Sequence, residues 1–228
     1  MNKYLTLVFF SLSTLGFLAC NDSDKKELSL PSEYDQIEDI LSIASCNSPF
    51  GRYTTEVNSY RNGSTYFYQK FDDRDRPFIV RVDSSSQGFL ISPTDSIVDT
   101  LGLAEVEMIR GHEFHKLSTN PKFFFDDIRY EGQMNHNTHS HDLFKGIDKL
   151  KNTVNLLYND EAQSISKIEL LNPLDTSQII EIIYNKWAES DFGKLAQSVT
   201  IVQAQKDTFS FDFHSLKLNI GSDQHEIF

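Results

Sequence analysis

Apolar and polar residues alternate along most of the second half of the chain. Strict alternation predicts β-strands, because successive side chains of a strand point to opposite faces of a sheet. Five such segments follow one another without an intervening helical pattern. We expect strands at about 154–158, 165–171, 178–187, 197–204 and 207–219. A run of strands of this kind constrains the fold to one built around an antiparallel sheet.

The last of these segments changes parity in its middle. Three aromatic residues share one face of the expected strand: Phe209, Phe211 and Phe213. Three aliphatic residues then have the opposite parity: Leu216, Leu218 and Ile220. Because a regular strand keeps one parity on each face, the sequence predicts a bulge or bend near His214. A strand that curves would need such an irregularity.

The first half of the chain also contains a series of strands. We expect them at about 52–60, 64–71, 77–82 and 89–91. The first two are separated by Asn62-Gly63, which is the strongest short-range signal for a hairpin. Residues 131–148 are polar and are expected to form a loop.

Two segments are predicted to be helical. The first begins after the N-cap Ser32 and ends near Cys46. Its apolar residues have helical spacing, and they are Ile37, Ile40, Leu41 and Ala44. The second spans 96–117, where Leu101, Ala104 and Met108 form a partial stripe. The expected class is α+β, a curved antiparallel sheet (an unclosed β-barrel) with helices packed against one face.

This order of elements over residues 32–219 resembles the lipoprotein-carrier (LolA-like) fold. The most specific part is the stretch from Tyr184 through Trp187 to Gly193, which is similar to the Tyr-x-x-Trp…Gly…Pro strand-turn-strand of that fold. Ala196 stands where proline is common. The resemblance implies a scaffold with an apolar concavity for lipid or acyl chains, although a fold alone does not fix a function.

The N-terminus has the pattern of a signal peptide. Lys3 precedes an apolar run from Leu5 to Leu18, which is too short to span a membrane as a helix. Phe17-Leu18-Ala19-Cys20 resembles the lipobox of bacterial lipoproteins. The resemblance implies a signal peptide at 1–19, acylation of Cys20 and attachment to the outer membrane. An acidic tether at 20–31 and a single domain at 32–228 would follow. The alternative is an ordinary secretory signal with a chance cysteine.

The overall charge limits the partners that the chain can have. The formal net charge is −12 at pH 7, which argues against nucleic acid, because phosphate binding requires a basic surface. Apart from Cys20 the chain has one cysteine, Cys46, so no intramolecular disulfide is expected in a mature protein.

Histidines suggest metal chemistry but do not fit a known motif. His112-Glu113-Phe114-His115 is one residue shorter than the zincin motif, which needs histidines at i and i+4. Residues 138–146 resemble the metal-binding loop of metallo-β-lactamase-fold hydrolases, but Leu143 and Phe144 replace two ligands. A different metal site could use the loop residues His136, His139, His141 and Asp142. We favour a solvated polar loop, with no metal, no cofactor and no catalytic residue.

Aromatic residues are the candidates for a ligand cavity. They are Tyr66, Tyr68, Phe124, Trp187, Phe209 and Phe211. We expect Trp187 near the mouth or outer edge of the sheet, because tryptophan favours the rim of an apolar region.

Three hypotheses for the function follow. The leading one is a non-enzymatic lipoprotein of the cell envelope that binds an apolar ligand or acyl chain. The alternatives are a module that recognises another envelope protein and, with less support, a metal-dependent hydrolase using the loop from His136 to His141.

Overall fold

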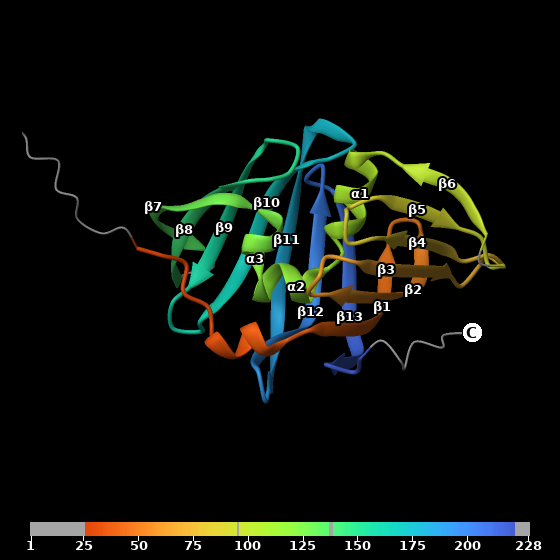
Figure 1. Ribbon diagram of the computed structural model, residues 1–228. Coiled ribbons are helices and arrows are strands. Elements are labelled where there is room, and N and C mark those ends of the chain that lie inside the picture. The colour runs from red at the N-terminus through yellow and green to blue at the C-terminus, as the bar shows by residue number, and fades with distance from the viewer. Residues whose placement is uncertain (1–25, 95, 137–138, 222–228) are drawn as a thin grey trace, which may run out of the picture.

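A computed structural model describes residues 26–94, 96–136 and 139–221 of the chain. It contains one curved antiparallel sheet of 13 strands, in the order β6-β5-β4-β3-β2-β1-β13-β12-β11-β10-β9-β8-β7 (Figure 1). The first six strands are β1 (Asp39–Ser48), β2 (Gly51–Tyr60), β3 (Thr65–Phe71), β4 (Phe78–Val82), β5 (Gly88–Ile91) and β6 (Ile97–Leu101). The others are β7 (Asp126–His136), β8 (His139–Ile147), β9 (Thr153–Asn159), β10 (Ser164–Asn172), β11 (Asp175–Ser190), β12 (Gly193–Gln203) and β13 (Asp207–Leu218).

The helical segment connects the two edges of this sheet. β6 and β7 are consecutive in the chain but lie at opposite edges and do not pair, so the sheet is an unclosed barrel. Between them run α1 (Leu103–Arg110), α2 (Phe114–Thr119) and α3 (Pro121–Phe124), and a short 3-10 helix, η1 (Ser32–Gln36), precedes β1. No helix in the described part of the chain is long and apolar enough to cross a membrane.

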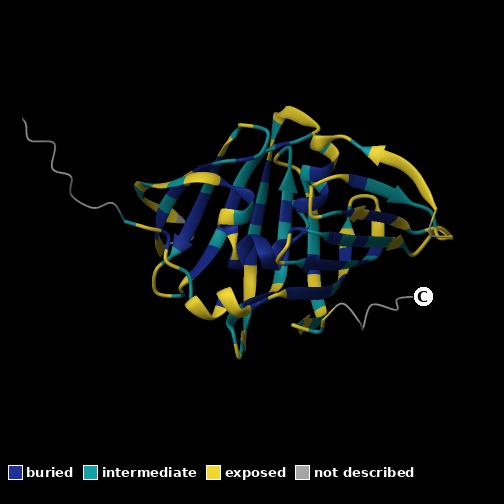
Figure 2. Ribbon diagram, viewed as in Figure 1, coloured by how far each residue is buried: buried dark blue, intermediate teal, exposed yellow. Residues whose placement is uncertain are grey.

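Side chains of one face of the sheet form the core together with this segment. The hydroxyl of Tyr184 on β11 donates a hydrogen bond to the carbonyl of Phe114, at 3.0 Å. The ring of Phe114 packs 4.9 Å from that of Phe211 on β13. On the other arm, Val106 of α1 lies against Gly88 of β5, where an added Cβ would come within 2.5 Å of its side chain. Buried and exposed residues alternate along many strands, as period two requires (Figure 2).

The bulge predicted near His214 is present. Ile43 of β1 pairs with Ser215, and the next residue, Ala44, pairs with Phe213. His214 is therefore the extra residue of a β-bulge. The bulge keeps the phenylalanines of β13 and the leucines after it on the same face, where Leu216 and Leu218 pack against a buried cluster that includes Ile40.

A second irregularity changes the side on which Trp187 lies. The pairing of β11 with β12 shifts between Tyr184 and Lys186 and again before Trp187. Simple alternation places Trp187 opposite Tyr184, but the two rings are stacked, with centroids 5.5 Å apart and planes at 26°. Trp187 is half-buried and packs against the main core.

The helix expected from Ser32 to near Cys46 was wrong beyond its first turn. η1 ends at Gln36 and is followed by β1, which pairs with β2 on one side and β13 on the other. Ile40 and Leu41 are both buried, although they point to opposite faces of a strand. A strand in the middle of a sheet can be apolar on both faces, and such a short apolar run cannot be told from a helix by spacing alone.

The segment 96–117 and the polar loop at 131–148 also differ from the expectation. The first begins as strand β6, and its helix is divided at Gly111–Glu113 into α1 and α2. The second is the hairpin of β7 and β8. β7 is an edge strand, so the backbone pairing of this hairpin does not require a strong apolar pattern.

Residues 26–31 contact the sheet. Leu28 is buried in the main core, and the Tyr158 hydroxyl of β9 donates a hydrogen bond to the Ser29 carbonyl. The Lys26 ammonium pairs with the carboxylates of Asp142 and Asp160. The sequence places these residues in the tether that precedes the domain. Cys20 and the lipobox lie outside the described residues.

Candidate functional site: an apolar pocket beside α1

A pocket of about 220 Å³ lies between α1 and the ends of several strands. Its apolar lining consists of Phe50, Tyr53, Phe71, Met108, Leu170, Pro173, Ile180, Ile182, Ile201 and Phe209. Ser48, Gln69, Glu107, Gly111, His112 and Gln203 complete the lining. Several of these residues are at or beside the β1–β2, β10–β11 and β12–β13 turns, which places the pocket at the end of the sheet where these turns lie.

Strand register aligns the apolar walls. Ile182 on β11 pairs with Ile201 on β12, which in turn pairs with Phe209 on β13. Opposite residues on neighbouring strands have neighbouring side chains, so these three form a row. On the other side of the pocket Tyr53 pairs with Phe71, and their ring centroids are 4.9 Å apart.

Exposure of the lining residues distinguishes the interior of the pocket from its mouth. Ile182 is 1% exposed, whereas Phe50, in the β1–β2 turn, is 63% exposed. The ring of Phe50 lies 6.1 Å from that of Phe209, which is half-buried. The buried part of the lining therefore combines isoleucines with the Tyr53 ring, which is 5% exposed, and Phe50 and Phe209 stand where solvent can enter.

α1 and the residues after it supply the acid and the imidazole of the pocket, and Ser48, Gln69 and Gln203 on the strands are its other polar side chains. Burial raises the pKa of Glu107 to about 7, and the nearby Arg110 opposes this shift. His112 Nδ1 lies 3.1 Å from the carbonyl oxygen of Met108, to which it can donate. Burial lowers the pKa of His112, so the ring is neutral near pH 7 and its Nε2 is then an acceptor.

The six residues expected to line a cavity are not brought together. Phe209 lines the pocket, and Phe211 is fully buried next to it, with its ring 6.0 Å from that of His112. Tyr66 and Tyr68 alternate with Phe67, which is buried together with Val106 of α1, so both tyrosines point to the other face. The roles of these residues in ligand binding stay predictions.

Phe124 and Trp187 lie in other parts of the core. Phe124 on α3 is buried among aromatic neighbours, with its ring 5.0 Å from that of Phe123. Trp187 stacks on Tyr184, further along β11 than the pocket residues Ile180 and Ile182. Neither side chain lines the pocket.

Sequence reasoning missed the contribution of the helix to the pocket. Met108 belongs to the partial stripe in 96–117, and His112 was considered only as a metal ligand. Glu107 has no sequence signal at all, because an acid on a helix is usually exposed to solvent. The available signal is the position of this helix, because a helix that connects the two edge strands of a curved sheet must turn one side to the interior.

The histidines do not converge on a metal site. His115 Nε2 lies 2.8 Å from the Ala196 carbonyl, whereas His112 Nδ1 lies near the Met108 carbonyl. His112 lies in the turn after α1, and His115 lies on α2. In the β7–β8 hairpin, His139 is exposed, and His141 Nδ1 is near the carbonyl of His139. The buried Asp142 carboxylate pairs with Lys26. Within 26–94, 96–136 and 139–221, no group of three His, Cys, Asp or Glu could hold a metal ion.

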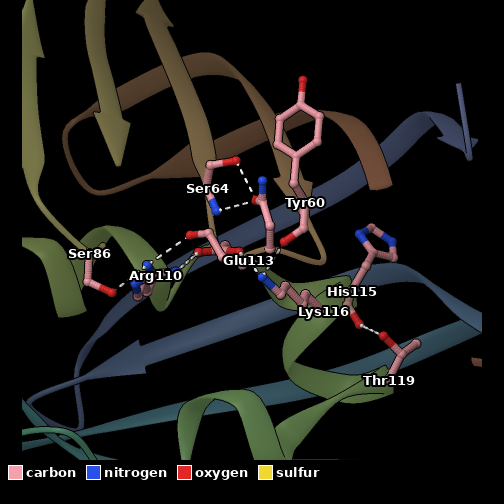
Figure 3. Close-up of polar contacts among 10 residues, drawn as sticks. Tyr60, Ser64, Ser86, Arg110, Glu113, His115, Lys116 and Thr119 are labelled. Atoms are coloured by element: carbon pink, nitrogen blue, oxygen red, sulfur yellow. Dashed lines mark hydrogen bonds and ion pairs between the residues drawn. The ribbon is translucent and has the colours of Figure 1, made fainter. Parts of the chain in front are cut away.

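Three buried charged residues of the same helical segment lie outside the pocket lining, beside the β2–β3 hairpin (Figure 3). We call Arg110, Glu113 and Lys116 the charged cluster; the exposed fractions of their side chains are 4%, 0% and 5%. Arg110 Nη1 is 3.1 Å from Glu113 Oε1, and Lys116 Nζ is 3.7 Å from Glu113 Oε2.

Backbone groups of the strands complete the charged cluster. Arg110 Nη2 donates to the carbonyl of Gly63, at 2.9 Å, and Lys116 Nζ donates to that of Tyr60, at 2.7 Å. Both acceptors belong to the β2–β3 hairpin. Gly63 has a φ of +91°, and a Cβ there would come within 3.0 Å of the Phe123 ring, so the Asn62-Gly63 turn is suited to this contact. Burial lowers the pKa of Lys116 to about 8.

Comparison with known proteins identifies the fold. No family model matches the sequence, and no curated protein matches it. A LolA-superfamily protein from Nitrosomonas europaea is similar in structure, with a TM-score of 0.61 and 12% identity over 84% of this chain and 92% of that one. A domain assigned to outer membrane lipoprotein sorting, from Vibrio parahaemolyticus, has a TM-score of 0.59 and 10% identity over 82% of this chain and 87% of that one.

A DUF1329 family protein from Desulfovibrio piger is also similar, with a TM-score of 0.55 and 11% identity over 83% of this chain and 89% of that one. Identities this low establish the fold and nothing more. The prediction from element order is confirmed: the chain has a LolA-like fold.

Proposed function

We propose that this protein is a non-enzymatic lipoprotein of the cell envelope that binds one apolar chain in the pocket beside α1. The observation that carries the proposal is the pocket itself. It is concave and mostly apolar, with a few polar groups in its lining, which is the usual composition of a small-molecule site. Among the described residues lining it, only Glu107 and His112 are titratable below neutral pH.

The volume limits what the ligand can be. Sites for drug-sized ligands measure about 300–1,000 Å³. The volume of about 220 Å³ lies below this range. A single short chain, or the end of a longer one, would fill this space. Several acyl chains would require α1 to move away from the strands.

The likeness to other proteins supports an acyl chain as the ligand. A similar solved domain is assigned to outer membrane lipoprotein sorting. The apolar part of a lipoprotein is its acyl chains, so a pocket for one chain agrees with a carrier or sensor of acylated molecules.

The N-terminus would hold the domain close to a membrane. If Cys20 is acylated, five residues separate it from Lys26, which pairs with Asp142. A fully extended chain spans at most ~3.6 Å per residue, so the reach is about 20 Å. The location that follows is the cell envelope, with the outer membrane as the expected attachment. The surface that carries Lys26, at β8 and β9, would then be nearest to the lipid.

Ligand titration tests the binding proposal. The chain from residue 21 onward contains every described element and is purified without lipid. A ligand that binds only the native state stabilises it by RT ln(1 + [L]/Kd), about 2.7 kcal/mol at 100 times Kd. We expect short-chain acyl ligands to raise the melting temperature, and the rise should grow with the logarithm of ligand concentration above Kd. Met108→Trp, which fills the pocket, should abolish the shift, and the exposed Met134→Trp should retain it. No shift with any acyl ligand would refute the proposal.

Cell fractionation tests the anchor. Cys20→Ala should release the protein from the membrane fraction or stall removal of the leader. If the variant is processed and pelleted like the wild type, the protein is not a lipoprotein.

A protein partner is the second candidate function, and strand β6 favours it. This edge strand exposes Ile97 and Val98, which are 64% and 61% exposed. An exposed edge can pair with an extended segment of another protein. A partner from the envelope would contact this edge, and Val98→Pro should then weaken the complex, because proline removes a backbone donor.

A further inference from the structure

We propose that the pocket selects single-chain amphiphiles whose polar group is uncharged or cationic and carries a hydrogen-bond donor, and that Glu107 excludes anionic head groups. This inference rests on the proposed function and specifies its ligand. The inference concerns the polar end of the ligand, whose apolar end occupies the buried part of the pocket.

The charge of the lining is the first argument. Among the described residues that line the pocket, Glu107 is the only acid, and none is lysine or arginine. An anionic head group would lose its water of hydration without gaining a cation. Burying a charge without a partner is costly. A head group of opposite sign would instead be attracted by the carboxylate.

The lack of a protein partner for the Glu107 carboxylate, among the described residues, is the second observation. Within the described residues its carboxylate accepts no hydrogen bond and makes no ion pair closer than 4 Å. Arg110, which lies three residues away on the same helix, is bound to Glu113, Gly63 and Ser86. The Glu107 carboxylate therefore has capacity to accept a hydrogen bond from a ligand.

The orientation of His112 is the third argument. When Nδ1 donates to the Met108 carbonyl, the neutral ring presents Nε2 as an acceptor. The aromatic rings of Phe67, Phe114 and Phe211 surround this imidazole at centroid distances of 5.3 to 6.0 Å. Protonation in such surroundings is unfavourable, so His112 cannot readily supply the missing positive charge. Two acceptors on one wall match a hydroxyl or an ammonium group.

Three probes with the same eight-carbon chain test this inference. They are octan-1-ol, octylammonium and octanesulfonate, each used well below its micelle concentration with the chain from residue 21 onward. At pH 8 we expect octanesulfonate to bind at least tenfold more weakly than octylammonium, with octan-1-ol close to octylammonium. Calorimetric titration supplies the three dissociation constants.

Glu107→Gln is the matched variant, because it removes the charge and keeps the shape. We expect it to strengthen octanesulfonate binding at least fivefold, to weaken octylammonium binding and to change octan-1-ol by less than twofold. Glu161→Gln removes the same charge from an exposed residue outside the pocket and should leave all three constants unchanged.

A pH series adds an independent readout. The charged or titratable groups around Glu107 are Arg110 on α1, Glu113 just after it, Asp148 and Lys149 in the β8–β9 turn, and His112 in the pocket. Octanesulfonate keeps its charge between pH 5.5 and 8, so a change in its affinity reports the protein. Discrimination against it should weaken at pH 5.5 in the wild type and should not change with pH in Glu107→Gln.

The outcomes separate the two proposals. If none of the three probes binds, the proposed function fails. If all three bind equally at pH 8, or if Glu107→Gln leaves their ratios unchanged, the selection by Glu107 is overturned while binding of apolar chains stands.

Discussion

The pocket and the charged cluster share one short helical segment and are built in opposite ways. On the pocket side, Met108 and His112 contact an apolar interior, and Glu107 has no hydrogen-bond or ion-pair partner among the described residues. In the charged cluster, Arg110 and Lys116 are closed off from water and bound to Glu113 and to backbone carbonyls.

This difference indicates that the charged cluster attaches the helical segment to the sheet, whereas the pocket side is suited to binding a ligand. Buried charges tolerate little displacement, since each must keep its partner. The cluster therefore fixes the segment to the β2–β3 hairpin. Apolar contacts have no direction, so the pocket side can lose or gain an occupant without breaking a hydrogen bond. This division predicts that variants of the cluster affect stability and that variants of the pocket affect affinity.

The largest effect is expected from breaking the cluster at its centre. Glu113→Ala leaves two buried cations without their carboxylate and should lower the free energy of unfolding by about 3–5 kcal/mol. Urea denaturation measures the change. Arg61→Ala, which removes an exposed pair with Glu38, should cost less than about 1 kcal/mol. A similar cost for both variants would contradict the account of the cluster.

Compared with variants of the charged cluster, variants of the pocket should lower stability less and ligand affinity more. Phe209 is half-buried, so Phe209→Ala should cost about 1–2 kcal/mol, less than the about 3–5 kcal/mol typical of a buried phenylalanine. Ligand affinity should fall at least tenfold, because one wall of the pocket is removed. Unfolding and titration of the same preparation give both values. Unchanged affinity would show that ligands bind elsewhere.

The pH dependence of the free energy of unfolding also distinguishes the pocket from the charged cluster. The pKa of Glu107 is raised to about 7, so between about pH 4.5 and 7 the folded state binds more protons than the unfolded state. This group therefore stabilises the fold most at low pH, and that contribution is lost as the pH rises through 7. Glu107→Gln should remove this decline, about 1–2 kcal/mol at a half-buried site.

Lys116 should act with the opposite sign at higher pH. Its pKa is lowered to about 8, so between about pH 8 and 10.5 the unfolded state binds more protons, and stability rises with pH. Denaturation curves of wild type and Glu107→Gln, measured from pH 4.5 to 10, separate the two groups. Parallel curves throughout would show that Glu107 ionises normally.

The smallest effect is expected on the outer face of the sheet. Tyr68 alternates with the buried Phe67 and is half-exposed, so Tyr68→Ala should cost less than about 1 kcal/mol and should not change ligand affinity. Titration with the ligand used for Phe209→Ala makes the comparison direct. A loss of affinity in Tyr68→Ala would mean that the outer face, and not the pocket, binds the ligand.

Strand alternation determined most of the fold from sequence. The five strands of the second half, the Asn62-Gly63 hairpin and the bulge at His214 depend on contacts between neighbouring residues or neighbouring strands, and these leave a period in the sequence. Parity shows which side chains share a face. That information was sufficient to predict a curved antiparallel sheet, and its failure to close was predicted from the resemblance to the LolA-like fold.

Only the tertiary structure decided which face is the interior and which segments meet there. Alternation placed Tyr66 and Tyr68 together but could not say that Phe67 is the residue beneath α1. The strand from Asp39 to Ser48 looked helical because its burial comes from β2 and β13, which are distant in sequence. The pocket joins α1 to β1–β3 and β10–β13. Burial of Glu107 and Lys116 depends on those long-range contacts, and no local pattern records them.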